Sequence, residues 1–177
     1  MRVAALAGAV LALTGCVGGT PLPTLPPSPT TTPIFASEEE ALAAAEEAYA
    51  AYLEVSNLIS SEGGVDPERI APFVTERRLE DELRGFATLR EHRLRVEGAT
   101  RFGVIELQQA SLDGEDAEVV FYACWDGSET RVFDSEGEDV TPADREVRVV
   151  LEVRTLTVQG LPPLVVESAE RWPARSC

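Results

Sequence analysis

The sequence predicts an α+β fold in which N-terminal helices pack on a curved antiparallel sheet. In the first part of the domain, apolar residues recur at spacings of three and four, as they do along one face of a helix. From Leu94 onward, apolar and polar residues alternate, which is typical of strands buried on one face. Because the pattern changes abruptly, we expect every helix to precede the sheet.

The first expected helix begins at Ser37. Its side chain can accept a hydrogen bond from the amide three residues on, and Glu40 can reach back, as in a capping box. Two shorter helices follow, one from Asp66 to Phe73 with Pro67 at its first position, and one capped by Thr75. The expected buried stripes comprise Leu42, Ala45, Tyr49, Tyr52, Leu53, Ser56 and Ile59 on the first helix, and Leu79, Leu83, Phe86 and Leu89 on the third.

The expected strands are separated by turns that contain Gly or Pro. They span residues 93–97, 101–111, 117–125, 130–134, 145–158 and 164–171. In the fifth of these, alternation places four apolar residues on one face, which we expect to be buried. They are Val147, Val149, Leu151 and Val153.

The N-terminus has the layout of a signal peptide. Arg2 precedes an apolar run, residues 3–13, that is too short to span a bilayer, for which about 20 residues are needed. Residues 13–16, Leu-Thr-Gly-Cys, resemble the bacterial lipobox, which implies cleavage before Cys16 and lipidation of its thiol. The plainer alternative is an ordinary secretory signal followed by a cysteine.

Three segments follow from this interpretation. Residues 1–15 are the signal peptide, residues 16–35 form a lipidated tether rich in Pro and Thr, and residues 36–177 form one α+β domain. The acyl chains would hold the protein on the outer face of the cell membrane, so the membrane is its expected partner. The localisation is then extracytoplasmic.

Charge narrows the possible partners. The net charge is −16, which argues against nucleic acid, since neutralising phosphates requires a basic face. All 15 basic residues are arginine, so Schiff-base chemistry through lysine is excluded. The lysine-free, Ala- and Arg-rich composition suggests a GC-rich genome and, together with the lipobox, an actinobacterial source.

The cysteines agree with export. If Cys16 carries lipid, Cys124 and Cys177 are the only possible pair in an oxidising compartment, and we expect a disulfide between them. On the chain-entropy model this bond would stabilise the fold by about 4 kcal/mol, a figure that strain could halve. The alternative is two free thiols.

Helices followed by long antiparallel strands resemble the nuclear transport factor 2-like (cystatin-like) fold over residues 36–172. The lipobox, the tether and the late Trp and Cys look like secreted actinobacterial lipoproteins that carry such a domain. The resemblance implies a sheet that curls around the first helix into a cone, which some members use for catalysis and others fill or use for binding. The fold alone does not decide among these.

Six residues are candidates for a site in the cone. Tyr49, Tyr52 and Asp126 are the catalytic candidates, since isomerase-like members of the family use a helix tyrosine and an acid in an apolar setting. Core packing of the tyrosines and a turn role for Asp126 are the alternatives. Phe121, Trp125 and Trp172 are candidates for the pocket wall, because a Cys124–Cys177 bond would bring the indoles together. Packing around the bond, or a plugged cone, is the alternative.

We expect no metal and no cofactor. His92 is the single histidine, which excludes a multi-histidine metal site, and the acidic stretches 113–116 and 134–139 do not have EF-hand spacing. The expected function is a non-catalytic domain that binds a small apolar ligand or an envelope protein. The alternatives are an isomerase or dehydratase that uses the cone, and a purely structural partner.

Overall fold

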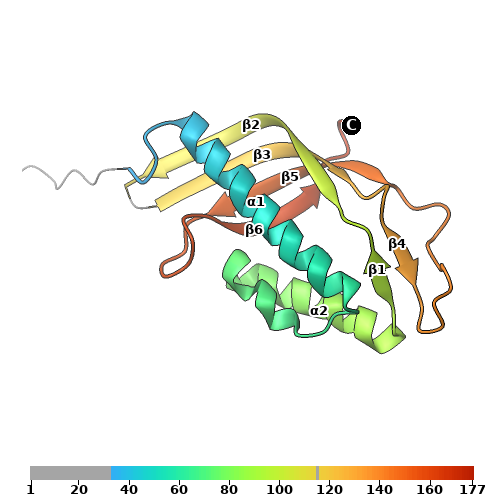
Figure 1. Cartoon of the computed structure of the whole chain (residues 1–177). Coiled ribbons are helices and arrows are strands. Elements are labelled where there is room, and N and C mark those ends of the chain that lie inside the picture. The colour runs from blue at the N-terminus through green and yellow to red at the C-terminus, as the bar shows by residue number, and fades with distance from the viewer. Residues whose placement is uncertain (1–32, 115) are drawn as a thin grey trace, which may run out of the picture.

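The structure, a computed structural model, describes residues 33–114 and 116–177 (Figure 1). The helices come first and the strands follow, as expected. They are α1 (Glu38–Ser61), η1 (Pro67–Phe73), α2 (Glu76–His92), β1 (Arg95–Glu97), β2 (Arg101–Asp113), β3 (Asp116–Asp126), β4 (Arg131–Phe133), β5 (Arg148–Leu156) and β6 (Val165–Arg171). The expected fifth strand was too long at both ends, because only residues 148–156 are paired with β3.

The main sheet has four antiparallel strands in the order β2-β3-β5-β6, and β1 and β4 form a separate two-stranded sheet. Figure 1 shows α1 lying across the main sheet, with α2 beside it. The prediction of an α+β fold with helices packed on an antiparallel sheet is confirmed. The sheet is open, since β2 and β6 are its two edges and do not pair with each other.

The helix caps agree with the sequence prediction in two cases of three. Ser37 Oγ accepts from Glu40 N at 3.1 Å, and Thr75 Oγ1 accepts from Arg78 N at 3.3 Å. Asp66 does not cap η1 through its side chain, because its φ of 46° places it in the left-handed region. The chain leaves α1 earlier, at Gly63 and Gly64, whose φ angles are 70° and 81°, and Pro67 stands at the start of η1.

The core lies between α1 and the inner face of the sheet. Tyr49 is buried, and its ring packs edge-on against Phe102 and Phe121 at centroid distances of 4.8 and 6.1 Å. The buried stripe of α1 differs at three positions from the expected one, since Leu42 and Ser56 are half-buried while Ala41 is buried. Of the four apolar residues expected to be buried on α2, only Phe86 is buried.

The outer face of the sheet is covered by the segment Trp172–Cys177, which we call the strap. Trp172 N donates to Val150 O at 2.8 Å, and Cys177 is bonded to Cys124 of β3. Val150 is therefore buried, whereas Val147 is 38% exposed, which contradicts the expected single buried face of β5. Periodicity could not reveal the second cover, because the strap has no regular structure.

The folded part includes residues that we assigned to the tether. Phe35 is buried in the core, and Ile34 N donates to Gly114 O at 2.9 Å. The boundary at residue 36 therefore falls inside the folded part, because the aromatic ring of Phe35 packs there. The expected signal peptide, Cys16 and the rest of the tether lie outside the described residues. Within residues 33–177 as described, no helix is long and apolar enough to cross a membrane.

Candidate functional site

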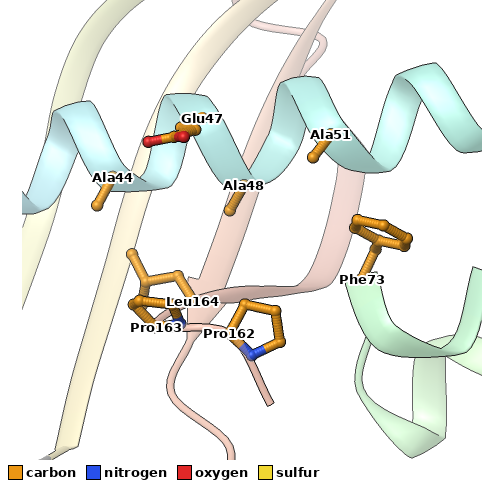
Figure 2. Close-up of a pocket in the computed structure, with 8 residues that line it drawn as sticks. All are labelled: Ala44, Glu47, Ala48, Ala51, Phe73, Pro162, Pro163 and Leu164. Carbon is orange, nitrogen blue, oxygen red and sulfur yellow. The ribbon is translucent and has the colours of Figure 1, made fainter.

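An apolar groove lies between α1, the end of η1 and the loop that joins β5 to β6 (Figure 2). Its volume is about 260 Å³. The groove is lined by Ala44, Glu47, Ala48, Ala51, Phe73, Pro162, Pro163 and Leu164. We call this set the apolar groove.

The groove exists because α1 carries small side chains where it passes the loop. Ala44, Ala48 and Ala51 are spaced by four and three residues, which places them on one helix face. Figure 2 shows their methyl groups pointing toward Pro162 and Pro163 across an open space. Larger residues at these positions would fill that space, as Tyr49 and Tyr52 fill the core on the neighbouring face of the helix.

The loop supplies the opposite wall. Gly160, with φ of 83°, makes a turn in which Leu161 N donates to Val158 O at 3.1 Å. The next two residues are prolines, which have no backbone N–H and so expose an apolar surface. Leu164, the residue before β6, is buried and lines the floor of the groove.

The lining determines what the groove can do. Glu47 is its single ionisable lining residue, and it is exposed. The remaining lining residues supply neither a nucleophile nor a general base. The groove is therefore suited to holding an apolar group rather than to bond-making chemistry.

A second hollow, of about 330 Å³, adjoins the groove and shares Pro162 and Pro163 with it. Its other lining residues are Ile34, Asp116, Thr157, Val158, Gln159 and Leu161. Ile34 is 40% exposed and Leu161 is 36% exposed. Ile34 and Leu161 thus extend the apolar side chains of the groove to the point where the described chain begins, in a hollow whose lining is otherwise mixed, since it includes Asp116, Thr157 and Gln159.

Of the three catalytic candidates, Tyr49 and Tyr52 stack on each other with ring centroids 5.7 Å apart, whereas Asp126 has Ser128 and Arg148 as its partners. Tyr49 is enclosed by Tyr52, Phe102 and Phe121, and burial raises the pKa of its phenol. Tyr49 is thus part of the core between α1 and the sheet, which is the alternative role given for it.

Tyr52 belongs to a polar cluster between α1 and α2. Its hydroxyl donates to Glu82 Oε1 at 2.8 Å and accepts from Arg78 Nη2 at 3.0 Å, while Arg78 and Glu82 pair at 2.7 Å. Burial, reinforced by the Glu82 carboxylate, raises the pKa of Tyr52 to about 12. The phenol is therefore protonated at neutral pH and acts as a hydrogen-bond link between the helices.

Asp126 lies at the end of β3, in a turn. Its Oδ1 accepts from Ser128 N at 2.9 Å, and its Oδ2 pairs with Arg148 Nε at 2.8 Å. The hydrogen bonds from Ser128, with help from Arg148, lower the pKa of Asp126 to about 2. A carboxylate in an apolar pocket would have a raised pKa, so these contacts favour the turn role for Asp126 over the catalytic one.

The aromatic candidates do not form one wall. Phe121 is fully buried in the core. Trp172, in the strap, packs on Tyr122 at a centroid distance of 5.3 Å on the outer face. Trp125 lies on the same face of β3 as Phe121, because the two residues are four positions apart in the strand. The Trp125 ring lies over Gly127, where an added Cβ would be 2.5 Å from the indole. The predicted disulfide between Cys124 and Cys177 is confirmed, but the two indoles lie on opposite sides of the sheet.

Within the described part of the chain, no group of three or more His, Cys, Asp or Glu side chains could hold a metal ion. The acidic stretch 134–139 instead closes on itself, because Asp134 Oδ1 accepts from the amides of Glu136 and Glu138, each at 2.9 Å.

Sequence reasoning missed the groove. Its signal was present in Ala44, Ala48 and Ala51, which repeat at helical spacing on a face other than the expected stripe. Leu161, Pro162 and Pro163 were assigned only to a turn. The packing of the loop between β5 and β6 opposite those alanines is part of the tertiary structure, which local sequence patterns do not reveal.

Comparison with known proteins supports the fold class alone. No protein-family model matches the chain, and no curated protein matches it. The intermembrane space region of the chloroplast protein ARC6 is similar in structure, with a TM-score of 0.51 and 11% identity over 72% of this chain and 92% of that one. The Kfla4162 protein from Kribbella flavida aligns with a TM-score of 0.41 and 13% identity over 79% of this chain and 95% of that one. The first of these likenesses indicates a shared α+β fold.

Proposed function

We propose that this chain is a bacterial lipoprotein, anchored through Cys16 on the extracytoplasmic face of the cell membrane. The support is the charged, apolar and small-residue order of residues 1–15 and the lipobox-like residues 13–16. The bond between Cys124 and Cys177 is consistent with an oxidising compartment. The domain belongs, in this proposal, to the nuclear transport factor 2-like group, on the strength of its helices-then-sheet order and the position of α1 across the sheet.

The domain's role in this proposal is non-catalytic binding of a small apolar ligand or of an apolar segment of an envelope protein. The observation that carries it is the apolar groove, a concave surface with a single ionisable lining residue in a chain of net charge −16. An apolar concavity in so acidic a surface favours a neutral apolar occupant.

The groove can be tested with the neutral dye Nile red, which fluoresces in apolar sites. In the chain from Val17 to Cys177, produced without lipid, Ala48→Arg places a long cation in the groove. We expect this variant to weaken dye binding by about tenfold or more, because it fills the space and adds a charge. Ala43→Arg is the matched control, since Ala43 is exposed on the same helix and does not line the groove. Equal dye affinity in the two variants would rule the groove out.

The anchor can be tested separately by expressing the full chain in an actinobacterium and measuring the mass of its N-terminal peptide. A mature N-terminus at Cys16 that carries acyl chains is the expected result. A Cys16→Ser variant should remain unprocessed and without lipid, because the thiol is the acceptor. Cleavage at another position, with Cys16 unmodified, would leave an ordinary secreted protein and remove the membrane from the proposal.

A further inference from the structure

We propose that the chain's own tether segment, Pro21–Pro27, binds the apolar groove of its domain in cis. This inference rests on the proposed binding role of the groove and names its occupant. The sequence of the segment is Pro-Leu-Pro-Thr-Leu-Pro-Pro. It supplies apolar side chains for an apolar surface, and four of its seven residues are prolines, which have no backbone N–H to satisfy.

The place where the described chain begins supports this occupant. Ile34 lines the hollow that shares Pro162 and Pro163 with the groove, so the preceding residues join the domain beside the groove. Six residues lie between Pro27 and Ile34, and twelve lie between Pro21 and Ile34. A Pro-rich extended chain rises about 3.1 Å per residue. The helix face formed by Ala44, Ala48 and Ala51 is only about 10 Å long, at 1.5 Å per residue. The segment can therefore reach the whole groove.

Charge favours the tether over a second copy of the chain. Residues 17–33 contain no charged side chain, whereas the chain as a whole carries −16. Two copies would repel each other as they approached, and Glu47 at the groove would add to that repulsion. The covalent link also holds the tether at an effective concentration in the millimolar range, so weak contacts suffice.

Docking would change the reach of the domain from the membrane. A free tether of residues 17–33 could extend about 50 Å at 3.1 Å per residue. With Pro21–Pro27 in the groove, only residues 17–20 would separate the domain from a lipidated Cys16, a span of about 12 Å.

The experiment compares alanine methyl signals by NMR in the chain from Val17 to Cys177 and in its Leu22→Ser/Leu25→Ser variant. We expect shifts at Ala44, Ala48 and Ala51 between the two, and nuclear Overhauser contacts from the Phe73 ring to leucine methyls that the double variant loses. Val17→Ser is the matched control, since it removes an apolar side chain from the same tether outside the docking segment. It should leave the three methyl signals unchanged. Identical groove signals in the chain and in the double variant would overturn the proposal, as would shifts that vary with protein concentration, which would indicate docking between copies.

Nile red titration separates this inference from the function on which it rests. If the tether occupies the groove, the Leu22→Ser/Leu25→Ser variant should bind the dye at least about threefold more tightly than the unsubstituted chain, because a competitor has been removed. Equal dye affinities that both fall with Ala48→Arg would overturn the tether docking and keep the groove. No dye binding in either chain would overturn the groove as well.

Discussion

The two faces of the main sheet are covered in different ways. On the inner face, Val119, Phe121 and Val153 are fully buried beneath the helices. On the outer face, Tyr122 and Val150 are also buried, but their cover is the strap, six residues without regular structure. Similar burial is thus reached on the inner face by a 24-residue helix and on the outer face by a short irregular segment.

The difference lies in what fixes each cover. A helix satisfies its own backbone hydrogen bonds and can bury a continuous stripe, so α1 needs no covalent link. The strap has few such bonds. It is held by the Cys124–Cys177 bond, by Trp172 N to Val150 O, and by Arg175, which pairs with Glu106 at 2.7 Å and lies over the Tyr122 ring. The outer face should therefore be the more easily opened of the two.

The comparison is tested most strongly by neighbouring residues on opposite faces. Phe121→Ala should lower the free energy of unfolding by about 4 kcal/mol, because it leaves a cavity against Tyr49 in the core. Tyr122→Ala should lower it by about half as much, since the strap can settle into the space. Urea denaturation of both variants measures this. Equal losses would mean that the strap packs as firmly as the helices.

The strap's covalent bond provides the next largest effect. Cys124→Ala/Cys177→Ala should lower the free energy of unfolding by about 2 to 4 kcal/mol, because the bond closes a loop of 53 positions. In a Trp125→Phe background, Trp172 is the single tryptophan, and its fluorescence should shift toward that of a solvated indole. A double variant with unchanged stability and unchanged fluorescence would show that the outer face holds the strap without the bond.

The sequence was informative where structure is local. Helical spacing and alternation placed every helix and strand of the described part to within a few residues, because these periods follow from backbone geometry. The disulfide followed from counting cysteines. The burial of Val150 could not be predicted from the sequence, because it depends on the strap, which follows β6 in the chain and has no periodic pattern.

The site was less predictable for the same reason. Tyr49, Tyr52 and Asp126 were chosen by chemical type, yet their neighbours decide what they do: Phe102 encloses Tyr49, and Arg148 holds Asp126 in a turn. The groove depends on the small size of the Ala44, Ala48 and Ala51 side chains rather than on functional groups. A search for reactive residues cannot find such a surface.

The helix side of the comparison can be sharpened through Tyr52. Its pKa of about 12 exceeds the ordinary value of 10, so the folded state holds this proton more tightly than the unfolded state does. That stability is fully present below about pH 10 and is lost as pH rises toward 12. Tyr52→Phe should cost about 1 kcal/mol at pH 7 through its two lost hydrogen bonds, and it should flatten the decline between pH 10 and 12. Urea midpoints across this range measure both effects. An unchanged slope would assign the alkaline decline to other groups, such as Tyr49.

The smallest expected effect concerns the outer end of the sheet, where Asp126 links β3 to β5 through Arg148. Its pKa, lowered to about 2, means that the folded state favours the carboxylate. The stability gained is present above the unfolded pKa of about 3.9 and is lost as pH falls toward 2. Asp126→Asn should therefore make unfolding in fixed urea less sensitive to pH over that window. Because Arg148 is itself exposed, solvent screens this pair, and the change should be smaller than that of any substitution above. If Asp126→Asn instead destabilised the fold as much as loss of the disulfide, the outer face would depend on its polar links rather than on the strap's covalent bond.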